Sequence, residues 1–498
     1  MTRTRPSEVR EVRPWIAGAS LDAEGWTEFS DPYSGDLVSR VARSDATVVE
    51  RAVAEARRIQ PSIAAIPAGE RAAILRRAAD IVESRALEVA STISRELGKA
   101  LKNTSREVRR SGATLRAAAT AAESLHGSVP DASVSSEGSG LLALSLRVPV
   151  GVVAAITPFN APFNLVMHKV APSFAAGNAT IVKPASQTAA TALDLIQILE
   201  EAGVPRGAIS LVPGDRTTVR ALASHTGIDL YSLTGGRAAA SAMADLVGPR
   251  RMLLELGGNS PNIVHSDADL DVAVRETIGG GFSNSGQSCN SVQRLYVHEA
   301  VADSFTERLV EATRLLRTGD PLDPATDVGT LVNEQSAERI ESWIRSAVER
   351  GARVLIGGGR VGATLEPTVV VDAPDDSQLV CDEVFGPVIV ILRFQTLDEA
   401  IRRANESSFG LMASVFTSSL GPAIQAARTL QAGGVLVNRS TNFRLDHLPY
   451  GGIKESGIGR EGPAYAVAEM TTLKLVLIDP LLGGPVANPS PAPASPTT

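Results

Sequence analysis

Residues 150–160 read VGVVAAITPFN, an apolar run that ends in a turn-like sequence. A helical segment through Ala175 and a second apolar run, Ala179–Val182, follow it. The alternation continues with a helical segment at Ala189–Ala202 and then with the apolar runs Ile209–Val212, Leu230–Leu233 and Met252–Leu256. Nearly continuous apolar strands separated by helices are typical of a parallel sheet covered on both faces. The pattern therefore predicts an α/β fold, and such folds bind ligands at the carboxyl ends of their strands.

The segments on either side of this core have different patterns. A β-like entry at Trp15–Val41 precedes residues 45–126, which are rich in Ala, Arg, Glu and Leu at helical spacing. Two later segments, Leu141–Arg147 and Thr472–Ile478, alternate like half-exposed strands, and we expect the second to pair with an edge strand. A second α/β pattern fills residues 257–446, with apolar runs at Arg294–Val297, Val388–Leu392 and Gly434–Asn438.

The composition limits the class of protein. A chain of 498 residues is too long for one hydrophobic core, so two or three domains are expected. With 48 Lys+Arg against 55 Asp+Glu, the net charge of −7 argues against a nucleic-acid-binding surface. The chain has no secretory signal and no apolar run long enough to span a bilayer, so no membrane partner is expected. Two cysteines do not make a disulfide framework, which favours a reducing cytoplasm.

One of these cysteines, Cys289, lies in unusual surroundings. It belongs to the stretch Gly279–Arg294, GGGFSNSGQSCNSVQR, which consists mostly of small and polar residues. A structural cysteine prefers apolar neighbours, where its thiol stays protonated and inert. The polar loop instead leaves space for a ligand and supplies hydrogen-bond donors, which favours a thiolate nucleophile and an oxyanion site. A buried cysteine on a turn is the alternative interpretation.

The dinucleotide fingerprint G-x-G-x-x-G occurs twice, and neither occurrence is in the right context. Gly357–Gly362 leads into another strand-like run, Thr368–Val371, so it predicts a hairpin. Gly457–Gly462 follows a polar loop. The fingerprint indicates a dinucleotide site only between a strand and a helix. Leu233–Gly236, which ends a strand and opens a helix, is the better candidate for a phosphate site.

Taken together, a set of short motifs resembles the NAD(P)-dependent aldehyde dehydrogenase superfamily over roughly residues 10–480. They occur in the family's order: Thr157–Asn160, Gly177–Pro184, Val212–Gly214, Leu233–Gly236, Leu254–Gly258, Gly286–Cys289, Glu383–Pro387 and Pro449–Gly457. The resemblance implies two Rossmann-like parallel-sheet domains and a small β arm for oligomerisation. It also implies a homodimer or homotetramer, because an exposed edge strand invites pairing with another subunit.

The resemblance implies the following division of the chain. Residues 1–127 and 148–256 form the dinucleotide-binding domain, and residues 257–446 form the catalytic domain. Residues 128–147 and 447–482 form the bridging and oligomerisation arm. The remaining tail, 483–498, lacks apolar residues and is expected to be disordered.

The resemblance also implies a catalytic mechanism without a metal. Cys289 attacks the aldehyde, and the side-chain amide of Asn160 with the Cys289 backbone N–H stabilises the oxyanion. Hydride transfer to the nicotinamide leaves a thioester, which water activated by Glu255 hydrolyses. A glutamate between apolar neighbours, as Glu255 is, would be costly without a role or partner. Lys169 matches a family lysine that is held near Asn160 and Glu255.

NAD or NADP is the implied cofactor. Its contacts are assigned to Ile156, Thr157, Pro158, Phe159, Lys183, Ser186, Gly214, Thr234, Gly235, Gly236, Leu256, Glu383 and Phe385. Many NAD-selective relatives carry glutamate at the position of Ser186, where it repels a 2′-phosphate, so the serine permits NADP without requiring it. Arg237 stands where many members have a small or hydroxyl residue.

For the substrate, the signature around residues 444–462 resembles the branch of lactaldehyde, non-phosphorylating glyceraldehyde-3-phosphate and phosphonoacetaldehyde dehydrogenases. Arg110 and Arg444 match positions that grip anions in that branch, although each arginine can equally belong to a surface ion pair. His168 and Ser288 are assigned to the substrate tunnel. We therefore predict a small anionic or hydroxylated aldehyde as substrate. Two alternatives stay open: a CoA-acylating dehydrogenase and a non-catalytic member of the fold.

Overall fold

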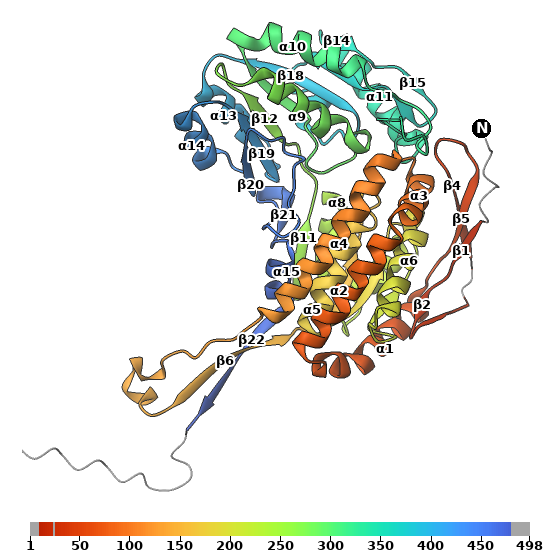
Figure 1. The fold of residues 1–498 in the computed structure, drawn as a ribbon, viewed down its shortest axis with the longest axis vertical. Coiled ribbons are helices and arrows are strands. Elements are labelled where there is room, and N and C mark those ends of the chain that lie inside the picture. The colour runs from red at the N-terminus through yellow and green to blue at the C-terminus, as the bar shows by residue number, and fades with distance from the viewer. Residues whose placement is uncertain (1–8, 23–24, 480–498) are drawn as a thin grey trace, which may run out of the picture.

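The computed structural model describes residues 9–22 and 25–479, and two mainly parallel sheets form its framework (Figure 1). The α/β fold predicted from the sequence is confirmed. In spatial order the first sheet contains β21 (Gly457–Ile458), β11 (Arg251–Glu255), β10 (Leu230–Thr234), β7 (Val152–Ile156), β8 (Ala179–Lys183), β9 (Ile209–Leu211), β2 (Trp15–Ile16) and β3 (Ala19–Ser20). Strands β11 to β9 are parallel, and antiparallel neighbours close both edges.

Helices cover this first sheet, and they agree with the helical segments expected from the sequence. They are α1 (Ala46–Ala65), α2 (Ala68–Ser84), α3 (Ala86–Leu97), α4 (Leu101–Glu123), α5 (Asn164–Ala176), α6 (Ala189–Glu201), α7 (Arg216–Ser224) and α8 (Arg237–Val247). Every residue of α5 is buried, because α4 and the sheet cover it from opposite sides. Helix α4 begins beside the second sheet's domain, where the Leu101 amide donates to the Pro321 carbonyl.

The second sheet lies in the other half of the molecule, in the upper part of Figure 1. Its order is β14 (Arg353–Ile356), β17 (Thr368–Val371), β18 (Val388–Phe394), β13 (Arg294–His298), β12 (Pro261–Val264), β19 (Met412–Phe416) and β20 (Gly434–Val437). It packs against α9 (Leu270–Phe282), α10 (Glu299–Arg314), α11 (Glu334–Glu349), α12 (Gln378–Cys381), α13 (Leu397–Asn405) and α14 (Leu420–Thr429). Strands β14 and β17 are antiparallel, which confirms that Gly357–Gly362 belongs to a hairpin. Within that hairpin, β15 (Arg360–Val361) pairs with β16 (Thr364–Leu365).

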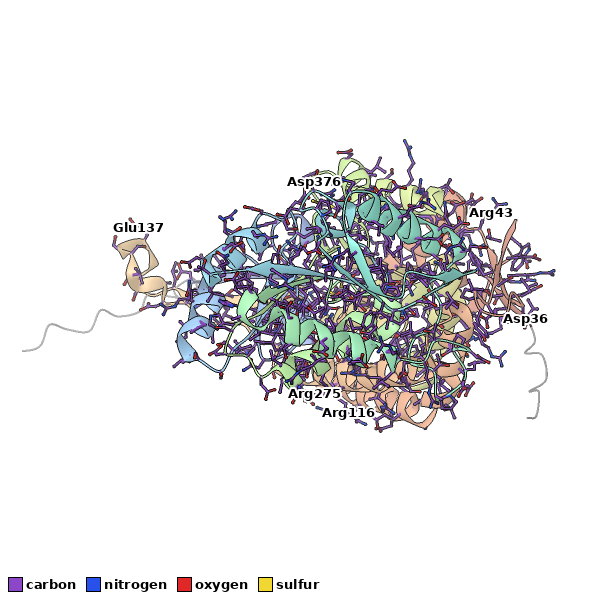
Figure 2. The ribbon with its side chains drawn as sticks, turned by 90° about the horizontal axis from the view of Figure 1, so that it is seen from above. Asp36, Arg43, Arg116, Glu137, Arg275 and Asp376 are labelled. Atoms are coloured by element: carbon purple, nitrogen blue, oxygen red, sulfur yellow. The ribbon has the colours of Figure 1, made fainter. Side chains whose placement is uncertain are left out.

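Two small β elements complete the structure. A separate N-terminal sheet joins β1 (Arg10–Val12), β5 (Leu37–Ala42) and β4 (Trp26–Ser30). An arm consists of β6 (Leu142–Pro149) paired antiparallel with β22 (Thr471–Ile478), which follows α15 (Pro463–Glu469). Figure 2 shows Glu137, in the loop before β6, well away from the body of the molecule. The expected pairing of these two segments is confirmed; the predicted disordered tail, 483–498, lies outside the described residues.

The first sheet positions the candidate site. Thr157 directly follows β7, Thr234 ends β10 and Glu255 ends β11, so three adjacent parallel strands deliver their carboxyl ends to one edge. The chain then passes from Glu255 through Gly257 and Gly258 into β12 of the second sheet. Both sheets therefore meet at the segment that carries Glu255. Over residues 9–22 and 25–479, no helix combines the length and the apolar character needed to cross a bilayer.

Candidate active site

Cys289 lies on a tight loop between α9 and β13. Helix α9 ends at Phe282, and a 3₁₀ turn, Ser283–Gly286, follows. In this turn Asn284, Ser285 and Gly286 all have φ between 53° and 69°, the left-handed region that is costly for residues other than glycine. The loop is anchored by side chains: Gln287 Oε1 accepts a hydrogen bond from the Val332 amide, and Ser285 donates to the Gly329 carbonyl. The strained backbone is thus held in one conformation beside the cysteine.

Two glycines allow the surrounding loops to approach this turn. A Cβ atom on Gly286 would lie 2.0 Å from the carbonyl oxygen of Gly386, in the loop that carries Glu383 and Phe385. A Cβ on Gly258 would lie 2.2 Å from the carbonyl oxygen of Cys289. These close approaches bring the Glu383–Pro387 and Leu254–Gly258 motifs against the cysteine loop, although they are far apart in the sequence.

The thiol of Cys289 faces a cavity of about 120 Å³. Its Sγ lies 3.3 Å from the hydroxyl oxygen of Tyr450, whose ring packs under the guanidinium of Arg444 at 3.9 Å from the ring centroid. Burial raises the pKa of the Cys289 thiol to about 12. The sulfur therefore rests as a protonated thiol in this structure, and a base has to accept its proton before it can act as a nucleophile.

Asn160 lines the same cavity as Cys289. Its side-chain amide donates one hydrogen bond to the Gln287 carbonyl at 3.0 Å, which leaves the second N–H of the amide for a ligand. Its backbone carbonyl accepts hydrogen bonds from Lys99 Nζ and Asn284 Nδ2, each at 3.0 Å. Both the backbone and the side chain of Asn160 are therefore tied to the cysteine loop, and an amide N–H donor lines the cavity that Cys289 lines.

Glu255 is a buried carboxyl group that lines a second, smaller cavity and lies close enough that its charge, next after burial, raises the pKa of the Cys289 thiol. Within the described part of the chain its Oε1 has no hydrogen-bond partner, although the side chain is buried. Burial, and next the negative charge of Glu461, raise the pKa of Glu255 well above its ordinary value. An unpartnered oxygen with a raised pKa is suited to accept a proton near neutral pH.

Lys169 lies near Glu255, as expected from the sequence, but its hydrogen bonds do not go to Asn160. Its ammonium group is fully buried and donates to Ser232 Oγ at 3.1 Å and to Glu461 Oε1 at 3.2 Å. Its positive charge reaches Glu255 and lowers that group's pKa. The cation that holds Asn160 is Lys99, because α5 points Lys169 at the first sheet and at Glu461 instead.

Four basic residues line the Cys289 cavity: Lys99, Arg106, Arg110 and Arg444. Three of them are paired with carboxylates. Lys99 bonds Glu107 at 2.6 Å, Arg110 grips Asp446 with two hydrogen bonds of 2.7 and 2.9 Å, and Arg444 bonds Glu461 at 3.1 Å. Arg110 and Arg444 therefore line the Cys289 cavity, as predicted, but each is already ion-paired with a carboxylate of the protein.

The other two predicted substrate residues, Ser288 and His168, line different cavities. Ser288 lines the Cys289 cavity. His168 is fully buried behind Asp446, to which its Nε2 is bonded at 2.9 Å, and it lines a separate small cavity with Glu255 and Glu461. Burial, and next the charge of Arg444, lower the pKa of His168. His168 is predicted from the sequence to line the substrate tunnel, but it does not line the Cys289 cavity and instead contacts Asp446, the partner of Arg110.

The predicted cofactor residues gather at the carboxyl edge of the first sheet. Ser186 donates to the Gly214 carbonyl at 2.7 Å, and burial lowers the pKa of Lys183 to about 8. Phe159 and Phe385 meet edge to face with ring centroids 5.8 Å apart. Ile156 ends β7, with Thr157 and Pro158 after it; Thr234, Gly235 and Gly236 join β10 to α8; Leu256 follows β11.

Glu383 also reaches this edge. It accepts a hydrogen bond from the Gly258 amide at 3.0 Å, and burial raises its pKa to about 7. Arg237, whose role the sequence left open, begins α8 and is ion-paired with Glu455. The Arg237 side chain therefore extends toward the C-terminal segment.

Several residues of the site were not assigned individually from the sequence. These are Lys99, Asp446, Tyr450 and Glu461. Three of them lie in the signature around residues 444–462 that pointed to the substrate branch, so the signal was present but gave no roles. Lys99 precedes α4 in a stretch without any distinctive pattern.

Comparisons with known proteins agree with this geometry. A family model described as "Aldehyde dehydrogenase family" matches residues 15–476. A 3-sulfolactaldehyde dehydrogenase of Priestia megaterium is 41% identical over 82% of this chain and 86% of that protein. An aldehyde dehydrogenase from Physcomitrella patens, solved with its reaction product succinate, superposes with a TM-score of 0.92 at 34% identity, covering 94% of this chain and 98% of that one. An NADP-dependent glyceraldehyde-3-phosphate dehydrogenase from Bacillus halodurans, solved with NADP, gives 0.91 at 32%, covering 94% and 99%.

Proposed function

Since this chain belongs to the aldehyde dehydrogenase family, we propose that it oxidises a small anionic aldehyde to its carboxylic acid through a covalent intermediate on Cys289. The protein is an NAD(P)-dependent aldehyde dehydrogenase by family. The observation that carries the finer proposal is the cavity that Cys289 and Asn160 share with four basic residues.

The first step joins the aldehyde to the sulfur. Water in the cavity accepts the proton of Cys289, Sγ attacks the carbonyl carbon, and the C–S bond forms while the carbonyl π electrons move to oxygen. The free N–H of Asn160 and the Cys289 backbone N–H stabilise the resulting alkoxide. Loss of one such donor typically costs about 10²–10³ in rate. Collapse of the alkoxide then expels a hydride from the former carbonyl carbon and leaves a thioester.

The second step releases the acid. Glu255, once ionised, takes a proton from a water molecule, whose oxygen attacks the thioester carbon. The C–S bond breaks, and the proton that Glu255 took from water passes to the departing sulfur, so that Cys289 recovers its thiol and Glu255 its charge. The raised pKa of Glu255 supports this role, because a stronger base accepts the proton of water more readily.

The residues at the carboxyl edge of the first sheet fit a nicotinamide dinucleotide. Thr157 Oγ1 and Thr234 Oγ1 are buried, and among residues 9–22 and 25–479 neither hydroxyl has a hydrogen-bond partner. No atom lies within 4 Å of a Cβ built on Gly236, so the N-terminus of α8 is open to a phosphate. We assign the adenosine side to Lys183, Ser186 and Gly214, and the nicotinamide side to Glu383 and Phe385. When bound, the dinucleotide supplies the hydride acceptor.

The charge of the cavity supports an anionic substrate. Lys99 and Arg110 are each bonded to a carboxylate, whereas Arg444 shares Glu461 with Lys169, so the cations around the cavity outnumber the carboxylates bonded to them. Among the lining cations, Arg106 is the one without a carboxylate partner in the described part of the chain. The name of the Priestia relative, which acts on a sulfonated aldehyde, points to the same class. The cavity is also lined by amide and hydroxyl side chains, including those of Asn103, Asn164 and Ser288, which can form hydrogen bonds with a hydroxylated carbon chain.

A direct test supplies the purified full chain with NAD⁺ or NADP⁺ and with short aldehydes that carry a sulfonate, carboxylate or phosphate group, or no charge. We expect reduced nicotinamide and an equal amount of carboxylic acid, with anionic aldehydes preferred. Cys289→Ala is expected to form neither product. Glu255→Gln is expected to form the thioester and retain it, which intact-protein mass spectrometry detects.

Free CoA separates the proposal from the acylating alternative. We expect the same carboxylic acid with and without CoA, because Glu255 directs water to the thioester. Formation of an acyl-CoA, or no turnover of any aldehyde by the unaltered protein, would contradict the proposed function.

A further inference from the structure

We propose that Arg106 is the residue that selects anionic aldehydes, by pairing with the substrate's acidic group at the mouth of the Cys289 cavity. This inference rests on the proposed function and deepens it. The sequence points instead to Arg110 and Arg444, but the structure bonds each of them to a buried carboxylate.

Asp446 is the reason that Arg110 is not available. Its carboxylate accepts two hydrogen bonds from Arg110 and one each from His168 and Asn164, at 2.7 to 3.3 Å. Burial alone would raise the pKa of Asp446, but His168 and Arg110 lower it far below its usual range. A carboxylate held this firmly stays ionised, and it takes the position at Arg110 that a substrate anion would need.

Arg444 is likewise compensated. Its guanidinium is buried, bonds Glu461 at 3.1 Å and has its Nε 3.6 Å from Asp446. Its face covers the ring of Tyr450. A substrate anion that displaced Glu461 would break this buried ion pair and leave Glu461, beside Glu255, with Lys169 alone, which is unfavourable.

Arg106 differs from Arg110 and Arg444 in its exposure to solvent and, over the described residues, in its lack of a carboxylate partner. It lines the cavity and is exposed to solvent, and within residues 9–22 and 25–479 no carboxylate is paired with it. It lies one helical turn before Arg110 on α4, so both side chains emerge on the same face of the helix. A substrate with its aldehyde at Cys289 therefore meets a paired arginine along the cavity and an unpaired one at its opening.

The chemistry of the ligand follows from this placement. Arginine binds planar or tetrahedral oxyanions through two parallel N–H donors, so a sulfonate, carboxylate or phosphonate is suitable. Because Arg106 is exposed, the interaction is partly solvated and its contribution is moderate. It acts on binding more than on the reacting carbon, since Arg106 is not placed with Cys289, Asn160 or Glu255 in the catalytic machinery.

Arg109 provides a matched control. It lies on the same helix and is also exposed, but it lines a different surface hollow with Glu83 and Leu87. Arg106→Gln and Arg109→Gln remove the same charge from α4. Any effect of the protein's overall field is common to both variants, whereas a contact with the substrate is lost only in the first.

The experiment measures kcat and KM for both variants and for Arg106→Lys, with a sulfonated or carboxylated aldehyde and with an uncharged aldehyde of equal length. For Arg106→Gln we expect the KM of the anionic aldehyde to rise about 10-fold with little change in kcat, since a charge-assisted bond at a partly exposed site contributes modestly. We expect less than about a two-fold change for the uncharged aldehyde and for Arg109→Gln. Arg106→Lys should recover part of the loss, and salt should raise the anionic KM less in Arg106→Gln than in the unaltered enzyme.

Three results would overturn the inference: equal losses on charged and uncharged aldehydes, equal losses in Arg106→Gln and Arg109→Gln, or an unchanged anionic preference in Arg106→Gln. Each is distinct from failure of the proposed function, in which the unaltered enzyme oxidises no aldehyde or shows no anionic preference.

Discussion

Substitution of Glu461 by glutamine is expected to lower the pKa of Glu255 and so to move the acid limb of thioester hydrolysis to lower pH. Burial is the largest cause of the raised pKa of Glu255, and the charge of Glu461 is the next. Glu461 also neutralises Lys169 at 3.2 Å and Arg444 at 3.1 Å, two cations that lower the pKa of Glu255. Removing this carboxylate therefore lowers the pKa of Glu255 in two ways: one negative charge is lost, and the positive charges of Lys169 and Arg444 are no longer offset by Glu461.

The size of the effect follows from these contacts. A charge close to a buried carboxyl group shifts its pKa by about 1–3 units. Since burial is the larger cause and is unaffected by the substitution, we expect the pKa of Glu255 to fall but to stay above its ordinary value. Glu255 works as a base only when ionised, and its ionised fraction grows as pH rises through its pKa. We therefore compare each enzyme's hydrolysis rate with its own maximal rate at high pH. At a pH below the pKa of Glu255 in the unaltered enzyme, this relative rate should be about 10-fold higher in Glu461→Gln.

The assay follows acyl-enzyme decay across pH by acid quenching and intact-protein mass spectrometry. Glu469→Gln, on the partly exposed end of α15, is the control for the loss of one negative charge. Because leaving Lys169 and Arg444 without their carboxylate costs about 3–5 kcal/mol, the rates must be measured well below the variant's unfolding temperature. A folded Glu461→Gln enzyme whose acid limb stays in place, or moves to higher pH, would refute the reasoning.

Three further substitutions test other parts of the structure. Asn160→Ala should lower kcat about 10²–10³-fold with little change in dinucleotide affinity, which titration calorimetry checks, because the variant loses an oxyanion donor and the bond to the Gln287 carbonyl but none of the assigned dinucleotide contacts; an equal loss of affinity would contradict this role. Gly286→Ala places a Cβ 2.0 Å from the Gly386 carbonyl oxygen at a φ of 69°, so the unfolding midpoint should fall by several degrees, and an unchanged midpoint would show that the loops separate freely. Ser186→Glu places a carboxylate at the adenosine side and should lower kcat/KM for NADP⁺ at least about 10-fold more than for NAD⁺; parallel losses for both would remove the assignment.

The fold was largely predictable because its signal is local. Buried strands such as β7 and β8 are continuous apolar runs, and the helices between them repeat their apolar residues at helical spacing. The hairpin around Gly357–Gly362 was predictable for the same reason, since strand-like runs bound it on both sides. The residues nearest the chemistry, Cys289, Glu255 and Asn160, were found through short motifs with an unusual local composition.

The pairing of charges across the site is not a local property. Arg110 and Asp446 are 336 positions apart, and Lys169 and Glu461 are 292 apart. No spacing rule connects such residues, so the sequence indicated arginines suited to an anion but not that Asp446 and Glu461 neutralise two of them. Lys99, and not Lys169, holds Asn160 because of how α4 and α5 pack.

Periodicity thus predicted the α/β architecture, and the short motifs that resemble the family implied the nucleophile and the kind of cofactor, because each of these signals lies in neighbouring residues. The charge left over in the cavity, and with it the role of Arg106, depends on which distant side chains packing brings within hydrogen-bonding distance. These contacts depend on how α4, α5 and residues 444–461 pack against one another, and no local sequence pattern specifies that packing.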